Sequence, residues 1–151
     1  MQRGPMLYQG KSKQVFATDD PARVVLRFTD QATAFNAKKK AEVADKGRIN
    51  CAITTHLFRK VEAIGVAHHL IEPVSATELL CHRVEIVPVE VVVRNRAAGG
   101  FTKRYGVEEG TVLPGPLVEL FYKSDALDDP LVTEDAAVML GWARRWELAY
   151  V

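Results

Sequence analysis

The sequence predicts an α+β fold: an N-terminal antiparallel sheet with one packed helix, followed by the start of a second α+β domain. Residues 7–18 and 23–29 alternate apolar and polar side chains, as strands with one buried face do. Residues 49–64 instead repeat apolar side chains at helical spacing, which is typical of an amphipathic helix. Residues 88–94 form an almost unbroken apolar run, which predicts a buried strand.

Composition and charge are those of an ordinary globular protein. The 151 residues are 48% hydrophobic and 26% charged, with a net charge of +1. This balance gives no indication of nucleic-acid binding, which usually needs a basic excess. No run approaches the ~18 apolar residues of a membrane span, and residues 1–10 lack the apolar core of a signal peptide. Cys51 and Cys81 are expected to be reduced core residues. We therefore expect a cytoplasmic protein with no nucleic-acid or membrane partner.

The first domain is predicted to cover residues 1–86. Its first two strands form a hairpin, residues 30–40 form a polar loop, and Gly65 ends the helix. Two more strands are predicted at 68–74 and 78–86. The helix carries a single apolar stripe, which consists of Ile49, Ile53, Leu57, Val61 and Ile64.

The second domain is predicted to cover residues 87–151. After the strand at 88–94 we expect a short helix at 98–105 that ends at Gly106, followed by a loop at 108–116. A strand at 117–123 and an acidic loop at 124–130 come next. Two helices are then predicted, one that is capped by Thr133 and breaks at Gly141, and one that begins near Arg144. Few later residues could cover the apolar group of Trp142, Trp146, Leu148 and Tyr150, so the sequence predicts a truncated chain.

Gly10-Lys11-Ser12 is not a P-loop, because the motif requires another glycine at a fixed distance and a strand–loop–helix context. If residues 7–18 form one strand, the side chains of Lys11 and Lys13 leave the same face. Two adjacent ammonium groups repel unless an anion lies between them, and a nucleotide polyphosphate fits there. Gly10 would let the ligand approach the backbone. The alternative is a solvent-exposed strand face with two lysines.

Arg94 ends the apolar run, where charged side chains usually line a cleft or rim. Its guanidinium suits two-point binding of a phosphate or carboxylate, and the small residues 97–100 leave room for a substrate. The alternative is a strand end that meets solvent. Asp125, Asp128 and Asp129 could hold Mg²⁺ together with phosphates, or could form only a turn.

Two other clusters of polar residues are not expected to form a functional site. His68 and His69 have no partner at metal-binding spacing and are expected to be structural. Residues 38–40, three lysines, are expected to be a solvated loop.

Six segments resemble, in order, the SAICAR synthetase family (phosphoribosylaminoimidazole-succinocarboxamide synthases). They are residues 7–13, 32–39, 46–50, 87–95, 103–110 and 121–125. The resemblance implies an ATP-grasp-like second domain and a nucleotide cleft between the domains. It also implies a ligase of purine biosynthesis that joins L-aspartate to carboxyaminoimidazole ribotide with ATP and Mg²⁺, and a possible homodimer.

The resemblance also implies the site residues by position. Those expected to bind ATP are Gly10, Lys11, Ser12, Lys13, Val15, Cys81, Arg83, Ile86 and Lys123. Those expected to bind the ribotide are Glu90, Arg94 and Gly100, where Gly100 replaces the usual serine of the family and loses a hydroxyl contact. The family's metal ligands are expected in segments that this chain lacks, which leaves Asp129 as the candidate here.

The chain as written is therefore expected to bind nucleotide without catalysing the ligation. A non-catalytic nucleotide-binding or interaction module is the alternative function. A kinase-like N-lobe is disfavoured, because the sequence contains no GxGxxG loop.

Overall fold

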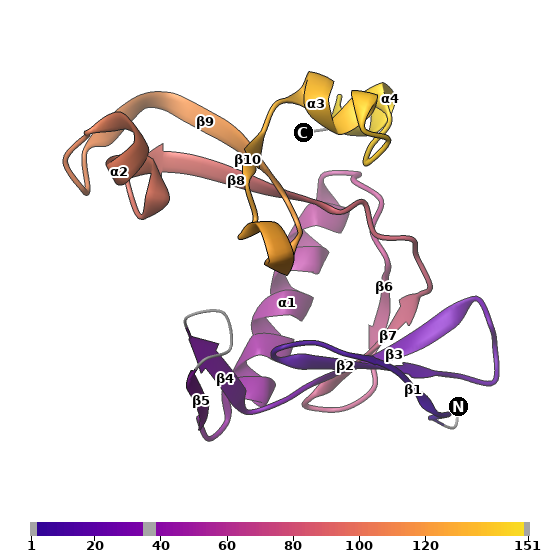
Figure 1. The fold of residues 1–151 in the computed structure, drawn as a ribbon. Coiled ribbons are helices and arrows are strands. Elements are labelled where there is room, and N and C mark those ends of the chain that lie inside the picture. The colour runs from indigo at the N-terminus through magenta and orange to yellow at the C-terminus, as the bar shows by residue number, and fades with distance from the viewer. Residues whose placement is uncertain (1–2, 35–38, 150–151) are drawn as a thin grey trace. The chain divides into compact units, whose positions relative to one another are not determined.

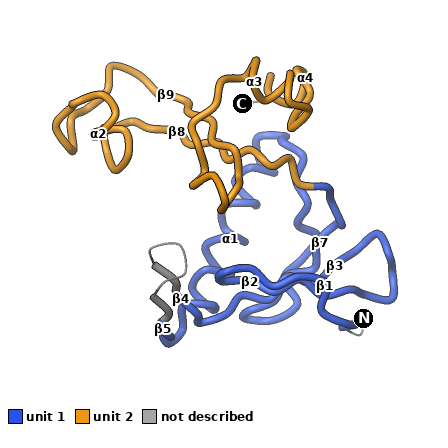
Figure 2. The backbone as a smooth tube through the Cα atoms, viewed as in Figure 1, with its two compact units in different colours: residues 1–85 blue, residues 86–151 orange. Residues whose placement is uncertain are grey.

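The computed structural model describes residues 3–34 and 39–149, and it has the predicted α+β fold (Figure 1). The chain divides into two compact units, with the boundary between Glu85 and Ile86 (Figure 2). No helix in the described part of the chain is long and apolar enough to cross a membrane.

Unit 1 is built on a five-stranded antiparallel sheet with the strand order β1-β2-β3-β7-β6 (Figure 1). The strands are β1 (Met6–Gln9), β2 (Lys13–Ala17), β3 (Arg23–Phe28), β6 (Leu70–Pro73) and β7 (Glu78–His82). One face carries the core, in which Val24, Phe28, Leu79 and Cys81 are buried together with Cys51 from the helix.

The prediction of a single strand over residues 7–18 is wrong. The chain folds back at residues 10–12, where the Gly10 N–H donates to the Lys13 carbonyl at 2.8 Å, so two strands replace one. Both halves alternate in polarity, and alternation alone does not reveal a turn between them. The predicted loop at residues 30–40 is also wrong in part, because β4 (Gln31–Ala34) pairs with β5 (Lys39–Glu42). Residues 35–38 lie outside the described part.

Helix α1 (Lys46–Ala63) forms where the periodicity predicts it, and Gly65 follows its end with φ = 79°. Its docking face is not the predicted apolar stripe, because Ile49, Ile53 and Leu57 are 47%, 52% and 54% exposed. The buried positions are Gly47, Cys51 and Thr55, which also recur at helical spacing. These small side chains allow a close approach, and a Cβ at Gly47 would lie only 2.8 Å from the Phe28 carbonyl oxygen.

Unit 2 contains a three-stranded antiparallel sheet with the order β10-β9-β8. The strands are β8 (Val89–Arg96), β9 (Val112–Tyr122) and β10 (Leu131–Val132). Strand β9 begins inside the predicted loop at 108–116. The expectation that β8 is buried is wrong, since Val91 and Val93 are 41% and 59% exposed.

Three helices of unit 2 follow the predicted order: α2 (Gly100–Tyr105), α3 (Glu134–Met139) and α4 (Arg145–Leu148). The 3₁₀ helix η1 (Asp125–Leu127) was not predicted and lies within the predicted acidic loop at 124–130. The Thr133 hydroxyl accepts the Ala136 N–H at 3.1 Å, which confirms the predicted N-cap. The late apolar group is not wholly uncovered: Trp142 stacks on Tyr122 with ring centroids 3.7 Å apart, and Leu148 is buried. Tyr150 lies outside the described residues.

Candidate functional site

The predicted nucleotide-phosphate residues of unit 1 surround the turn between β1 and β2. Lys11 lies in the turn and Lys13 begins β2, so the two side chains do not project from one strand as predicted. The Lys13 ammonium lies 5.3 Å from the centre of the Phe28 ring, on the core-bearing face of the sheet. Lys11 and Lys13 therefore belong to different elements, the turn and β2, although they remain neighbours in the chain.

The backbone of the turn is held by protein contacts. The Gly10 N–H donates to the Lys13 carbonyl, and the Ser12 carbonyl accepts a hydrogen bond from the Thr29 N–H at 3.0 Å. A Cβ at Gly10 would lie 3.3 Å from the Tyr8 ring, so a small residue suits this position. Tyr8 is 65% exposed and pairs with Val15 across the strands. Sequence reasoning did not select Tyr8, although an exposed aromatic ring beside Val15 suits contact with a base.

The residues predicted to border the adenine lie in different surroundings. Val15 packs against the buried cluster that contains Cys81. Burial raises the pKa of the Cys81 thiol to about 11, against the opposing effect of the Lys13 charge. Arg83 follows β7, and its backbone N–H bonds to the Ala22 carbonyl at 2.8 Å. Ile86 is the first residue of unit 2 and is 77% exposed.

In unit 2, the β8–β9 register gives the sheet one apolar face and one charged face. The apolar face, partly covered by α3 and α4, contains Val89, Leu120 and Val132. The charged face contains the predicted residues Glu90, Arg94 and Lys123, together with Glu119. The structure thus brings three predicted site residues to one surface.

Lys123 is held by two carboxylates at this surface. Its Nζ lies 2.6 Å from Asp129 Oδ2 and 3.0 Å from Glu90 Oε2. Hydrogen bonds to Asp129 and Glu90 raise the pKa of Lys123, so the ammonium form is favoured. A phosphate ligand would have to share this lysine with the two acids.

Asp129, the predicted magnesium ligand, uses both of its carboxylate oxygens in contacts with the protein. Its Oδ2 accepts from Lys123, and its Oδ1 accepts the Ser124 N–H at 2.9 Å. Within residues 3–34 and 39–149, no group of three or more His, Cys, Asp or Glu side chains is arranged to hold a metal ion.

Glu119 and Arg104 are charged residues that sequence reasoning missed. The Glu119 side chain is 5% exposed and receives Arg94 Nε at 2.5 Å on one oxygen and Arg104 Nη2 on the other. Burial opposes ionisation of Glu119, but the hydrogen bonds from both arginines outweigh it, and its pKa is lowered. The three side chains form an arginine–glutamate–arginine triad.

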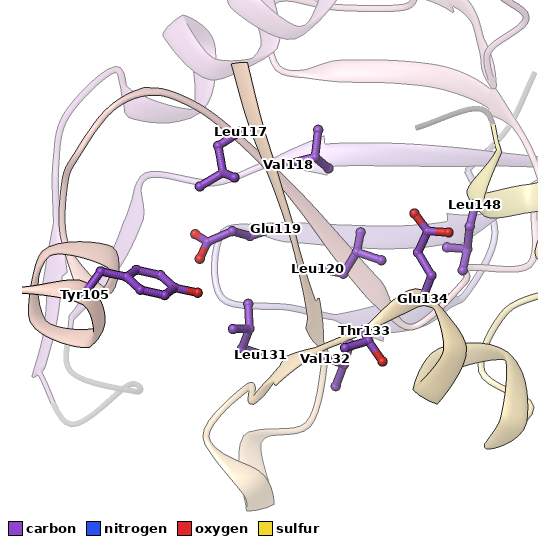
Figure 3. Close-up of a pocket in the computed structure, with 10 residues that line it drawn as sticks. All are labelled: Tyr105, Leu117, Val118, Glu119, Leu120, Leu131, Val132, Thr133, Glu134 and Leu148. Atoms are coloured by element: carbon purple, nitrogen blue, oxygen red, sulfur yellow. The ribbon is translucent and has the colours of Figure 1, made fainter. Parts of the chain in front are cut away.

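A cavity of about 440 Å³ runs along the edge of β9 next to β10. Figure 3 shows Leu117 and Glu119 leaving β9 toward the side of Tyr105, and Val118 and Leu120 leaving it on the opposite side. The cavity lies where β10 ends and the edge of β9 is no longer paired to it. None of the residues predicted to bind ATP or ribotide is among those that line it.

Comparison with known proteins reveals relatives along nearly the whole chain. The family model described as SAICAR synthetase matches residues 6–151. Phosphoribosylaminoimidazole-succinocarboxamide synthases from Magnetococcus marinus and Deinococcus radiodurans are 52% and 55% identical over 148 residues. These matches cover 98% of this chain but only 61% and 62% of the two relatives, so the chain spans less than two thirds of their length.

Solved structures have the same fold. The crystal structure of the synthase from Ehrlichia chaffeensis superimposes with a TM-score of 0.93 at 39% identity, covering 97% of this chain and 62% of that one. A SAICAR synthetase in complex with ADP superimposes with a TM-score of 0.86 at 38% identity, covering 91% of this chain and 58% of that one.

Proposed function

The chain belongs to the SAICAR synthetase family, and we propose that it takes part in the ATP-dependent ligation of L-aspartate to carboxyaminoimidazole ribotide. The products of this reaction are SAICAR, ADP and phosphate. The observation that carries the proposal is the family match over residues 6–151, with relatives of that name at more than 50% identity.

Most of the residues assigned to the nucleotide lie in unit 1. Lys11 and Lys13 supply two positive charges at a tight turn, and Gly10 and Ser12 form the backbone of that turn. Val15, Cys81, Arg83 and Ile86 are assigned to the adenine side by the family resemblance, and Lys123 of unit 2 to the phosphates. A structure of a relative with ADP supports nucleotide use in the family.

The ribotide is assigned to the charged face of unit 2, where Arg94 offers a fixed guanidinium and Glu90 lies on the same surface. Gly100, at the start of α2, supplies no hydroxyl contact.

The proposed chemistry explains why ATP is needed. A carboxylate is a poor electrophile, so the terminal phosphoryl group of ATP is transferred to an oxygen of the imidazole carboxylate, and ADP leaves. The aspartate amine then attacks the acyl carbon, loses a proton and expels phosphate. The protein residues mainly position the groups and offset their negative charge.

Mg²⁺ belongs to the same proposal, because in phosphoryl transfer it neutralises charge on the nucleotide phosphates. Within the described residues no cluster of three or more His, Cys, Asp or Glu side chains is arranged to hold the ion. A cytoplasmic location, expected from the sequence, and a homodimer, suggested by the family resemblance, are also part of the proposal.

Product formation tests the proposal against its alternative, a non-catalytic nucleotide-binding module. The purified protein is incubated with ATP, Mg²⁺, L-aspartate and the ribotide, and SAICAR is measured by mass spectrometry together with the intact mass of the protein. The ligase predicts SAICAR and ADP in equal amounts over many turnovers, with no SAICAR formed when L-aspartate is omitted. A protein of 16.8 kDa that binds ADP and forms no SAICAR would favour the alternative for this chain.

A further inference from the structure

Strand β8 lies at an edge of the sheet of unit 2. The strand order is β10-β9-β8, so among the described residues β8 has a strand neighbour on one side only. The Lys123 N–H donates to the Pro88 carbonyl at 2.9 Å, which makes these two residues a hydrogen-bonded pair of the β8–β9 ladder. Because bonded and non-bonded pairs alternate in an antiparallel ladder, the N–H and C=O groups of Val91 and Val93 point away from β9.

The open edge of β8 lacks the features that usually protect an exposed strand. Such edges commonly carry prolines, lysines or bulges. On the outer side of β9, beyond the short strand β10, Pro116 stands where an N–H would otherwise face that side. Residues 89–94 of β8 contain no proline or lysine and pair with β9 in an unbroken register. Since Val91 and Val93 are 41% and 59% exposed, this edge can pair with a further strand.

The sequence of β8 is complementary to itself when two copies run antiparallel. If two copies meet at this edge around a twofold axis at Val92, Val91 of each lies opposite Val93 of the other. Each such pair exchanges both of its backbone hydrogen bonds. The same register places Glu90 of each copy opposite Arg94 of the other on the charged face of the sheet, where opposite charges across two strands are favourable.

Other positions of the twofold axis fit less well. An axis at Glu90 or at Arg94 would place two like charges directly opposite each other, which is unfavourable. An axis at Val91 would place Glu90 opposite a valine. An axis at Val93 would place Val91 opposite Asn95 and extend past the register shift that follows Arg94. The remaining axis combines matched valines with matched charges.

We propose that the open edge of β8 pairs with the same edge of a second copy of the chain, so that two sheets of unit 2 join into one. Lys123 already contacts Glu90 and Glu119 contacts Arg94, so the charges across the two copies select the register and add little affinity. The added strand lies beside the charged face and leaves that face open. The inference deepens the homodimer of the proposed function, and rests on it, by assigning its surface.

Cysteine cross-linking tests the edge and its register. At the twofold axis Val92 lies opposite Val92 of the second copy, in a pair without backbone hydrogen bonds whose Cα atoms are about 4.5 Å apart. A disulfide spans Cα distances of about 4.4–6.8 Å. Val92→Cys is therefore oxidised with diamide, which takes up the two thiol hydrogens, and the covalent dimer is measured on a non-reducing gel. The parent chain is a control, because Cys51 and Cys81 are only 2% and 0% exposed.

We expect Val92→Cys to form the covalent dimer and the parent chain not to form it. Val118→Cys should also remain monomeric, because this exposed valine lies on β9, one strand away from the edge. Val91→Cys and Val93→Cys should cross-link with each other in an equimolar mixture and little when each is alone, since each position lies opposite the other.

Association without a cross-link is the second measurement. The paired edge is short, so we expect a concentration-dependent dimer, measured by sedimentation of the full chain over a concentration series. Val93→Lys places a charge at the edge and should raise the dimer dissociation constant about tenfold or more. Val118→Lys is the matched control, because Val118 pairs with Val93 on the same face, and it should associate like the parent. Thermal unfolding verifies that each variant folds.

The outcomes separate this inference from the rest of the proposed function. A chain that stays monomeric at every concentration would overturn both the inference and the proposed homodimer, while nucleotide binding and ligation would be unaffected. A dimer in which Val92→Cys does not cross-link and Val93→Lys associates like the parent would overturn the inference alone. Equal cross-linking of Val118→Cys and Val92→Cys would indicate random collision and would overturn it too. Faster cross-linking of Val91→Cys alone than of Val92→Cys would contradict the register.

Discussion

Glu119 shows at the residue scale how a buried acid can remain ionised. Burial alone would raise its pKa, but two arginines donate to its oxygens and lower the pKa below the ordinary value of 4.5. An acid with a lowered pKa in the folded state stabilises that state at a pH above its unfolded pKa. This stabilisation is lost as the pH falls through the folded pKa, because the proton then binds in both states.

We therefore predict a specific acid sensitivity for this side chain. The difference in unfolding free energy between the parent chain and Glu119→Gln should be constant near neutral pH and should shrink below about pH 4.5, where the unfolded-state carboxyl takes up its proton. Urea unfolding from pH 7 to pH 3 measures this difference. A difference that grows in acid would contradict the assigned direction of the pKa shift.

The roles of single residues were the hardest feature to predict from the sequence. Arg94 could be selected because a cation follows an apolar run, whereas Glu119 looks like an ordinary solvent-facing residue of a strand. Its partners depend on the β8–β9 register, in which Val92 pairs with Glu119 and Arg94 with Leu117. Lys11 and Lys13 were selected for a shared strand face that the turn removes.

At the scale of elements, the position of helix α1 could be predicted from the sequence, whereas its buried face could not. Its position and its end at Gly65 follow from periodicity and from the glycine, and both could be predicted. Its docking face could not, since the sequence has two helical stripes, one of large apolar residues and one of small residues. Small residues pack where the helix lies close to the backbone of the sheet, and the hydrophobicity of a side chain does not reveal the distance between helix and sheet.

Gly47 tests this docking geometry. Gly47→Ala places a Cβ 2.8 Å from the Phe28 carbonyl oxygen, which is backbone and gives way poorly, so we expect a loss of about 1–3 kcal/mol in unfolding free energy. The matched control is Gly115→Ala, where a Cβ would have no neighbour within 4 Å and the backbone needs no positive φ. Denaturant unfolding compares the two variants. Equal stability of both would show that α1 does not approach the sheet so closely.

The sheet of unit 2 was predicted less completely. A Gly- and Pro-containing stretch is typical of a loop, yet β9 already begins at Val112, which pairs with Arg96 of β8 before the register shifts and Leu117 pairs with Arg94. The strand signal of 117–123 and the capped helix at Thr133 were correct, since turn and cap residues act locally.

At the scale of the whole molecule, the chain consists of two units, and each carries residues assigned to one of the proposed ligands. Unit 1 supplies the turn assigned to the nucleotide phosphates, and unit 2 supplies the charged face assigned to the ribotide. The family could be recognised from six short segments because their order and spacing are specific even where each segment is weak. The chain spans 61% and 62% of the length of the two relatives.

Binding of ADP tests the central claim, that this chain holds the nucleotide through the turn between β1 and β2. Calorimetric titration should show ADP binding to the parent chain and about tenfold or more weaker binding to Lys11→Ala and Lys13→Ala, because each loses a charged phosphate contact. Lys60→Ala, which removes an exposed lysine of helix α1 in the same unit, should bind like the parent. A parent chain that does not bind ADP, or Lys11→Ala and Lys13→Ala variants that bind it as tightly as Lys60→Ala, would contradict the account.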